Sequence, residues 1–201
     1  MTGCAELGYE TLFPLDMISL IPSASESVAL ESASDWSLDC VFSAPREDVF
    51  KAWTEAGILA QWWGPHAFTN PVCEMDVRPE GRYRLTMRSP DGTDYPLQGK
   101  WVEVGAPRRL VMTVDCSRYP AAWLDLLKTA DAPEEVNLPK PLLLTVNLSE
   151  VTEGTLLSLR LSFDSPALCE FFLRQGLCEG WVESFESLAA LLVILGPDES
   201  M

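Results

Sequence analysis

The last long apolar stretch of the chain, from Ser165 to Leu195, has the spacing of an amphipathic helix. Its large apolar residues recur at steps of three and four positions, which places them on one stripe of the helix. They are Leu168, Phe171, Phe172, Leu177, Trp181, Phe185, Leu188, Leu192 and Leu195. Asp164 or Ser165 can cap the start, and Gly196 with Pro197 ends the pattern. A stripe this long must be buried, so the chain upstream is expected to supply the layer that receives it.

Upstream of this helix, apolar and polar residues alternate in seven segments, as they do in strands that have one buried face. The segments are residues 35–43, 72–78, 82–88, 93–104, 108–115, 142–150 and 155–163. Turn residues between several of them, as at 89–92 and 152–154, favour hairpins. We therefore predict an α+β fold, in which a curved antiparallel sheet of about seven strands wraps on the long C-terminal helix.

Two short helices are predicted between the first and second of these segments. Pro45 fits the first position of a helix, and Glu47 lies where the positive end of the helix dipole favours an acidic side chain. Residues 55–63 form the second helix, which Gly64 and Pro65 end. The predicted order of elements is then β-α-α-β-β-β-β-β-β-α.

The pattern divides the chain into one domain with appendages. Residues 34–196 hold the predicted domain, and residues 197–201 form a tail. Residues 1–33 combine a proline-framed apolar stretch with a segment rich in Ser, Ala and Glu, which favours a weakly ordered N-terminal extension. Residues 116–141 interrupt the strands as an insertion. Two interpretations of the insertion are open, a lid over the mouth of a cavity or a surface excursion that packs Trp123 on the domain.

Charge and cysteine content limit the classes of partner and the cellular compartment that we expect for this protein. The 201 residues include 30 acidic and 14 basic ones, a formal net charge of -16. Such a surface repels phosphate backbones and anionic lipids, so nucleic acids and membranes are not expected partners. No Lys or Arg precedes Arg46, which argues against a secretory or transit leader. Six cysteines without a C-x-x-C pair favour reduced thiols, and we expect a cytoplasmic protein.

Five motifs follow one another along the chain at residues 44–54, 62–65, 76–83, 89–92 and 180–188. They read APREDVFKAWT, WWGP, DVRPEGRY, SPDG and GWVESFESL. Their order and spacing resemble the START-like superfamily, also called SRPBCC, whose helix-grip fold is shared with the birch pollen allergen. Within it, the chain is most similar to the family of heat-shock-protein-90 ATPase activator homologues.

The resemblance implies a seven-stranded antiparallel sheet that grips a long C-terminal helix and encloses an apolar cavity. Relatives in this superfamily include cyclases, hydrolases and lipid carriers, and the namesake of the family stimulates a chaperone ATPase. The chain departs from the family by its N-terminal extension, by the insertion at 116–141 and by Glu80, where the family usually shows glycine. Three roles stay open: a binder of a small ligand, a co-chaperone-like regulator of a chaperone ATPase, and a cyclase- or hydrolase-type enzyme.

Motifs for catalysis and metal binding are mostly absent from the sequence. His66 is the single histidine, and without paired His or Cys it does not make a metal site. No phosphate loop or dinucleotide-binding glycine pattern occurs, so no cofactor is expected. An enzyme would need His66, Asp76 or Tyr83 to point into a water-accessible cavity. This lack of motifs favours a role without catalysis.

A set of aromatic and methionine residues is predicted to converge between sheet and helix. The set can be ordinary core, or it can line an adaptable apolar pocket, because Met repacks and Trp or Tyr offers a polar tip. The candidate ligand-binding residues are Trp62, Trp63, Phe68, Met75, Tyr83, Met87, Tyr95, Trp101, Met112, Phe172, Trp181 and Phe185. Gly176 and Gly180 either leave volume for a ligand or let the sheet approach. We expect a small hydrophobic ligand, with a protein partner as the alternative.

Overall fold

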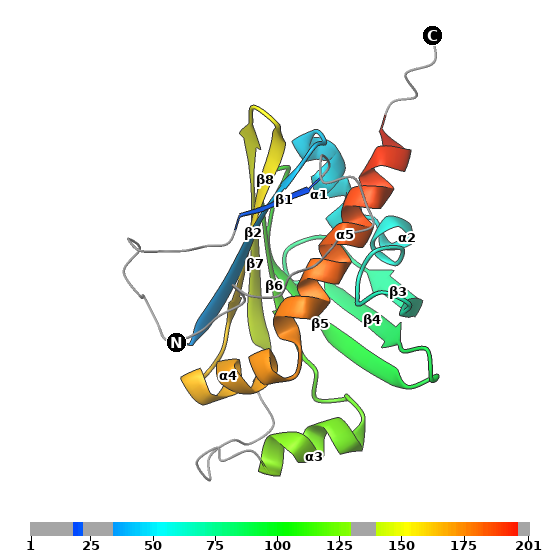
Figure 1. Ribbon diagram of the computed structural model, residues 1–201, viewed down its shortest axis with the longest axis vertical. Helices are drawn as coiled ribbons and strands as arrows, with labels where there is room; N and C mark the ends of the chain where they lie inside the picture. The colour runs from blue at the N-terminus through cyan, green and yellow to red at the C-terminus, as the bar shows by residue number, and fades with distance from the viewer. Residues whose placement is uncertain (1–17, 22–33, 130–139, 197–201) are drawn as a thin grey trace.

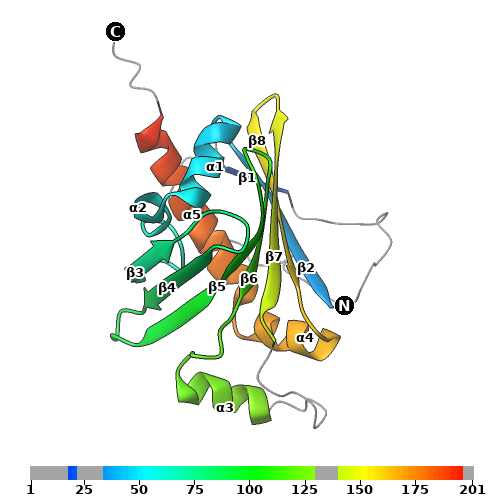
Figure 2. The same cartoon turned by 180° about the vertical axis from the view of Figure 1, so that it is seen from behind.

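The computed structural model describes residues 18–21, 34–129 and 140–196 of the chain (Figure 1). Its strands form one sheet in the order β1-β2-β8-β7-β6-β5-β4-β3, with every neighbouring pair antiparallel. The strands are β1 (Ile18–Ile21), β2 (Asp35–Phe42), β3 (Thr69–Met75), β4 (Arg82–Arg88), β5 (Asp94–Gly105), β6 (Arg109–Val114), β7 (Leu142–Val151) and β8 (Gly154–Ser162). The helices are α1 (Arg46–Thr54), α2 (Ala56–Leu59), α3 (Ala121–Thr129), α4 (Pro166–Arg174) and α5 (Leu177–Leu195). Figures 1 and 2 show α5 lying across one face of the curved sheet.

The fold class predicted from the sequence is confirmed. Strands β2 to β8 correspond to the seven alternating segments, and α1 and α2 follow the first of them. An additional strand, β1, comes from the predicted N-terminal extension and pairs with β2, with Ile18 opposite Phe42 and Ile21 opposite Asp39. The sheet therefore has eight strands where about seven were expected. Residues 1–17 and 22–33 of the extension, 130–139 of the insertion and the tail 197–201 lie outside the described residues.

The C-terminal stretch forms two helices in place of the single one expected over 165–195. Ser165 caps α4, because its side chain accepts a hydrogen bond from the backbone N–H of Leu168 at 3.2 Å. The break falls at Gly176, whose φ of 85° lies in the left-handed region that glycine adopts without strain. The chain then resumes as α5, which is 19 residues long. None of the helices among the described residues has both the length and the apolar character needed to cross a membrane.

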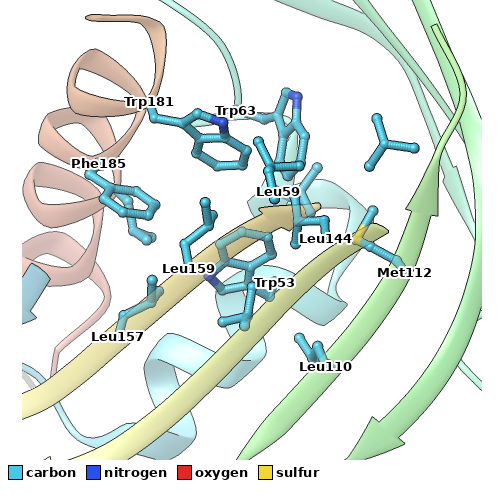
Figure 3. Close-up of a cluster of buried hydrophobic side chains, with 14 of the residues drawn as sticks. Trp53, Leu59, Trp63, Leu110, Met112, Leu144, Leu157, Leu159, Trp181 and Phe185 are labelled. Carbon is cyan, nitrogen blue, oxygen red and sulfur yellow. The ribbon is translucent and has the colours of Figure 1, made fainter. Parts of the chain in front are cut away.

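The core lies between α5 and the sheet, as the stripe on the helix requires. Figure 3 shows Trp181 and Phe185 of α5 facing Leu157 and Leu159 of β8, with Trp53 of α1 beside them. Phe185 and Leu159 are 0% and 1% exposed. Burial of large apolar side chains is the dominant favourable term in folding, so this contact holds the two layers together.

The register of β4 is the one that the alternation predicts. Tyr83 and Leu85 are buried, whereas Arg82 and Arg84 are exposed. A slip of one residue would exchange the two sets and bury the arginines, which fixes the register strongly.

Strands β5 and β6 approach unusually closely at Gly99. A Cβ atom on this residue would lie 1.9 Å from the carbonyl oxygen of Thr113, so only glycine fits there. The same carbonyl accepts a hydrogen bond from the hydroxyl of Tyr83 at 2.7 Å. This close approach fixes the end of β6, from which Val114 and Cys116 reach the cavity described next.

Candidate functional site

A cavity of about 190 Å³ lies between the sheet and the corner at which α4 meets α5. Buried aliphatic side chains of β5 to β8 line its sheet side, namely Leu97, Val114, Leu142, Leu144 and Leu161. Gly176 and Gly180 line its helix side, and Gln175 at the corner is exposed. The two glycines carry no side chain, so they leave this volume unfilled.

Aromatic rings from two separate groups line the cavity. In the first group, Trp63 and Trp181 meet edge to face, with ring centroids 5.1 Å apart. In the second, the ring of Trp123 lies 5.0 Å from that of Tyr119 and 5.3 Å from that of Phe172. Within the described part of the chain no ring contact joins the two groups. The cavity is therefore lined by two networks of aromatic rings, packed mainly edge to face, with no ring contact between the two networks among the described residues.

The insertion supplies Tyr119 and Trp123 of the second group. Its helix α3 begins directly after Pro120, whose carbonyl oxygen accepts a hydrogen bond from the backbone N–H of Trp123 at 2.9 Å. The ring of Trp123 packs against both Phe171 and Phe172 of α4. Trp123 thus packs on the domain, as one interpretation of the insertion held, and it also lines the cavity, as the lid interpretation requires.

Among the described residues, those that line the cavity include no charged side chain. Burial raises the pKa of the Cys116 thiol to about 12, and the neighbouring Asp115 carboxylate adds to the effect, so this thiol is neutral at ordinary pH. Burial also raises the pKa of the Tyr119 hydroxyl. The hydroxyl of Ser184 is engaged by backbone groups on both sides. The site is accordingly apolar and uncharged, with a few neutral polar groups.

Four of the residues predicted to bind a ligand line this cavity: Trp63, Met87, Phe172 and Trp181. The other eight do not, namely Trp62, Phe68, Met75, Tyr83, Tyr95, Trp101, Met112 and Phe185. Their contacts lie elsewhere in the core: the indole N–H of Trp62 donates to the carbonyl of Ala52 at 3.0 Å, and Phe185 packs edge to face on Phe42. A binding role for any member of the set stays a prediction.

Sequence reasoning missed Tyr119 and the aliphatic residues of the sheet. The aliphatic residues alternate like every other core position of their strands, so no signal marks them as cavity-lining. Tyr119 and Trp123 form an aromatic pair four residues apart inside the insertion. That pair was the one signal that pointed to this wall of the cavity.

None of the three residues on which a catalytic role depended lines this cavity, although Asp76 and Tyr83 line a second hollow described below. His66 is half exposed, with Nε2 3.4 Å from a carboxylate oxygen of Glu186. Asp76 pairs with Arg78 at the surface, with 2.8 Å between the charged groups. Tyr83 is buried, and its hydroxyl donates a hydrogen bond to the carbonyl oxygen of Thr113. Among the described residues, no group of three or more His, Cys, Asp or Glu side chains could hold a metal ion.

A second hollow, of about 780 Å³, lies over the exposed side of β3, β4 and β5. Its charged residues include both signs, and several are paired, as Arg84 is with Glu74 and Lys100 with Glu80. Exposed pairs of this kind contribute little energy and favour neither anion nor cation. The apolar cavity between the sheet and the helices is therefore the candidate site.

The sequence model of the family described as "Activator of Hsp90 ATPase homolog 1-like protein" matches residues 43–193. Among solved structures, a protein from Nitrosomonas europaea is similar with a TM-score of 0.66 and 24% identity, over 81% of this chain and 96% of that one. A protein from Mycobacterium smegmatis has a TM-score of 0.65 and 21% identity, over 81% and 93%. The AHSA1 protein from Silicibacter pomeroyi has a TM-score of 0.58 and 21% identity, over 80% and 98%. No curated protein matches the chain.

Proposed function

The chain belongs to the family of Activator of Hsp90 ATPase homolog 1-like proteins, and within that family we propose that it binds a small hydrophobic or aromatic molecule in the cavity between the sheet and α5. The observation that carries the proposal is a partly open cavity of about 190 Å³ whose described lining is uncharged and mainly apolar. A void of this kind costs packing energy, and an apolar occupant would recover it. We further propose that the protein acts in the cytoplasm with reduced thiols.

The energetics of burial support such a role. Removing apolar ligand surface from water contributes roughly 25 cal/mol per Å². A ligand that buries a few hundred Å² can therefore reach about micromolar affinity after the costs of ordering are subtracted. The rings of Trp63, Trp123 and Trp181 supply large contact surfaces that lose little conformational freedom on binding.

Binding is a better proposal than catalysis because the cavity offers no acid, base or nucleophile that is active near neutral pH. Its thiol, Cys116, has a pKa of about 12, and an ionised nucleophile is therefore scarce. His66, which could serve as a general base, lies beside the partly exposed side chains of Glu183 and Glu186, outside the lining.

The proposal is tested with a substitution whose side chain fills the cavity. In Gly180→Leu, the new side chain starts at a Cβ 3.7 Å from Pro65, which also lines the cavity, so it occupies the space of the ligand. We expect wild type to bind members of a library of small aromatic compounds in native mass spectrometry and tryptophan quenching, and Gly180→Leu to lose that binding. The control is Ala190→Leu, the same kind of side chain on an exposed position of α5. Absence of any binder for the wild type contradicts the proposal.

A co-chaperone role is the second candidate, and one feature favours it. The last turn of α5 exposes three apolar side chains, with Val193, Ile194 and Leu195 58%, 77% and 45% exposed. An unpartnered apolar patch of this kind is a common mark of a protein contact. The test is the ATPase rate of the chaperone with and without this protein, and an increase that is lost in Ile194→Glu would support this role.

A further inference from the structure

Resting on the proposed function, we infer that the occupant of the cavity is a neutral aromatic molecule of one or two rings that carries one oxygen acceptor, as an aryl ketone does. Three properties of the site lead to this class. They are its volume, its lack of charge, and the hydrogen-bond donors on its lining that the protein leaves without a partner.

The volume sets the size of the ligand. A buried apolar cavity of about 150 Å³ holds one benzene molecule. The cavity here measures about 190 Å³, which suits a single ring with a small substituent and reaches its limit at two fused rings. A molecule of lipid size would have to extend out of this partly open cavity into solvent.

The charge of the ligand follows from its surroundings. None of the described residues that line the cavity is charged, so a bound carboxylate would lose its hydration without gaining an ionic partner from them. The formal net charge of -16 also lowers the local concentration of anions around the protein. A neutral molecule avoids both costs.

The polar group of the ligand follows from the donors. The hydroxyl of Tyr119 and the indole N–H groups of Trp63 and Trp181 lie on residues that line the cavity. None of the three donates a hydrogen bond to another of the described residues. Their rings contact other aromatic rings: Trp63 and Trp181 both contact Trp53, and Tyr119 contacts Tyr95 and Trp123. Burial keeps Tyr119 protonated, so it is a permanent donor. One acceptor oxygen on the ligand would satisfy Tyr119 where the protein does not.

Ser184 does not compete for this role. Its hydroxyl hydrogen is directed to the carbonyl oxygen of Gly180, at 2.7 Å, and is therefore not available to a ligand. Gln175 is exposed at the corner between α4 and α5, where water solvates its amide. Tyr119 is thus the donor that we assign to the acceptor oxygen.

Three probes of nearly equal shape test the inference on the wild-type protein: ethylbenzene, acetophenone and benzoate. Their dissociation constants can be measured by isothermal titration calorimetry. We expect acetophenone to bind about threefold to tenfold more tightly than ethylbenzene, since one net hydrogen bond is worth roughly that factor. Benzoate is expected to bind at least about tenfold more weakly than acetophenone, because its charge is not compensated.

The variant Tyr119→Phe tests the assigned donor. It should reduce the preference for acetophenone over ethylbenzene toward one, while the affinity for ethylbenzene itself changes little. The control, Ser187→Ala, also removes one hydroxyl, but Ser187 does not line the cavity and its hydroxyl donates within α5 to Glu183. It should leave the preference unchanged.

The results distinguish a failure of this inference from a failure of the proposed function. Equal affinities of acetophenone and ethylbenzene, tighter binding of benzoate, or an unchanged preference in Tyr119→Phe would overturn the inference while the cavity stays a binding site. If none of the three probes binds, or if Gly180→Leu binds them as well as wild type does, the proposed function itself falls. The comparison of the three probes needs no variant, so it decides the question even if Tyr119→Phe does not fold.

Discussion

The hydroxyl of Ser184 in α5 accepts a hydrogen bond from the backbone N–H of Gly64 at 3.1 Å, across 120 positions of sequence. The same hydroxyl donates to the carbonyl oxygen of Gly180 at 2.7 Å. Gly64 has a φ of 105°, so the turn after α2 takes a conformation that favours glycine. This buried contact fastens the helix to the turn, and both residues line the cavity.

The variant Ser184→Ala is expected to lose about 1–3 kcal/mol of unfolding free energy, because the buried N–H of Gly64 keeps its desolvation cost without a partner. Urea denaturation followed by circular dichroism measures this loss. Ser187→Ala is the matched control, with an expected change within about 0.5 kcal/mol. An equal effect of the two substitutions would contradict the role assigned to Ser184.

Replacing each of the two glycines on the helix side of the cavity by alanine is expected to change the free energy of unfolding in opposite directions. At Gly176, φ is 85°, and a Cβ there costs about 1–2 kcal/mol. At Gly180, inside α5, the new Cβ meets only Pro65 at 3.7 Å, and alanine should add up to about 1 kcal/mol through its helix propensity. Chemical denaturation of both variants checks the signs, and destabilisation by Gly180→Ala would show that the helix packs more tightly there than described.

Stability is expected to fall as pH rises above about 9. Burial raises the pKa of Cys40 to about 12, and the pKa of Cys116 rises to about 12 for the same reason. In the unfolded chain a thiol ionises near pH 8.5, so the unfolded state loses protons that the folded state keeps. The stabilisation is therefore complete below that pH and is lost as pH rises toward the folded pKa values.

The measurement for this prediction is the midpoint of urea unfolding between pH 7 and 10, under reducing conditions. The double variant Cys40→Ala/Cys116→Ala should show a flatter profile in this window. Above about pH 10 a second decline remains in both proteins, because buried Tyr83 and Tyr119 then begin to matter. A decline below pH 10 that is as steep in the double variant as in wild type would rule out the thiols as its cause.

Ligand-dependent quenching of tryptophan fluorescence is expected to depend on the rings that line the cavity. In Trp181→Phe, binding of acetophenone should quench a smaller share of the emission than in wild type, because one of the indoles next to the ligand is absent. Trp36→Phe, which removes an indole from β2 outside the lining, should keep the full response. Loss of the response in Trp36→Phe alone would place the ligand elsewhere.

Much of the fold could be predicted because most elements have one solvent-exposed side and one buried side. The alternation of Tyr83 and Leu85 with arginines defined β4, and the stripe through Trp181 and Phe185 defined α5. The break at Gly176 was harder to predict, because a helix tolerates an isolated glycine and only the backbone conformation shows that the helix ends. Strand β1 was missed because four residues are too few for a period to be recognised.

The candidate site was less predictable than the fold. The set of aromatic residues was chosen by residue type, and type does not tell which buried rings border an unfilled volume. Trp62 and Trp63 are neighbours in sequence, yet the indole N–H of Trp62 donates a hydrogen bond to the carbonyl of Ala52 in the core, and only Trp63 lines the cavity. A cavity is a failure of packing between distant segments, and the insertion that brings Tyr119 to it has no periodic pattern to place it.

Strand β1 has a consequence for any shortened version of this protein. Because β1 pairs with β2 along four residues, with Leu20 opposite Cys40 as one of the pairs, β2 is an interior strand of the sheet. A fragment that begins at residue 34 would turn β2 into a border strand with uncovered N–H and C=O groups. Such borders readily recruit strands from other molecules. The shortened protein would then be prone to self-association for a reason unrelated to the cavity.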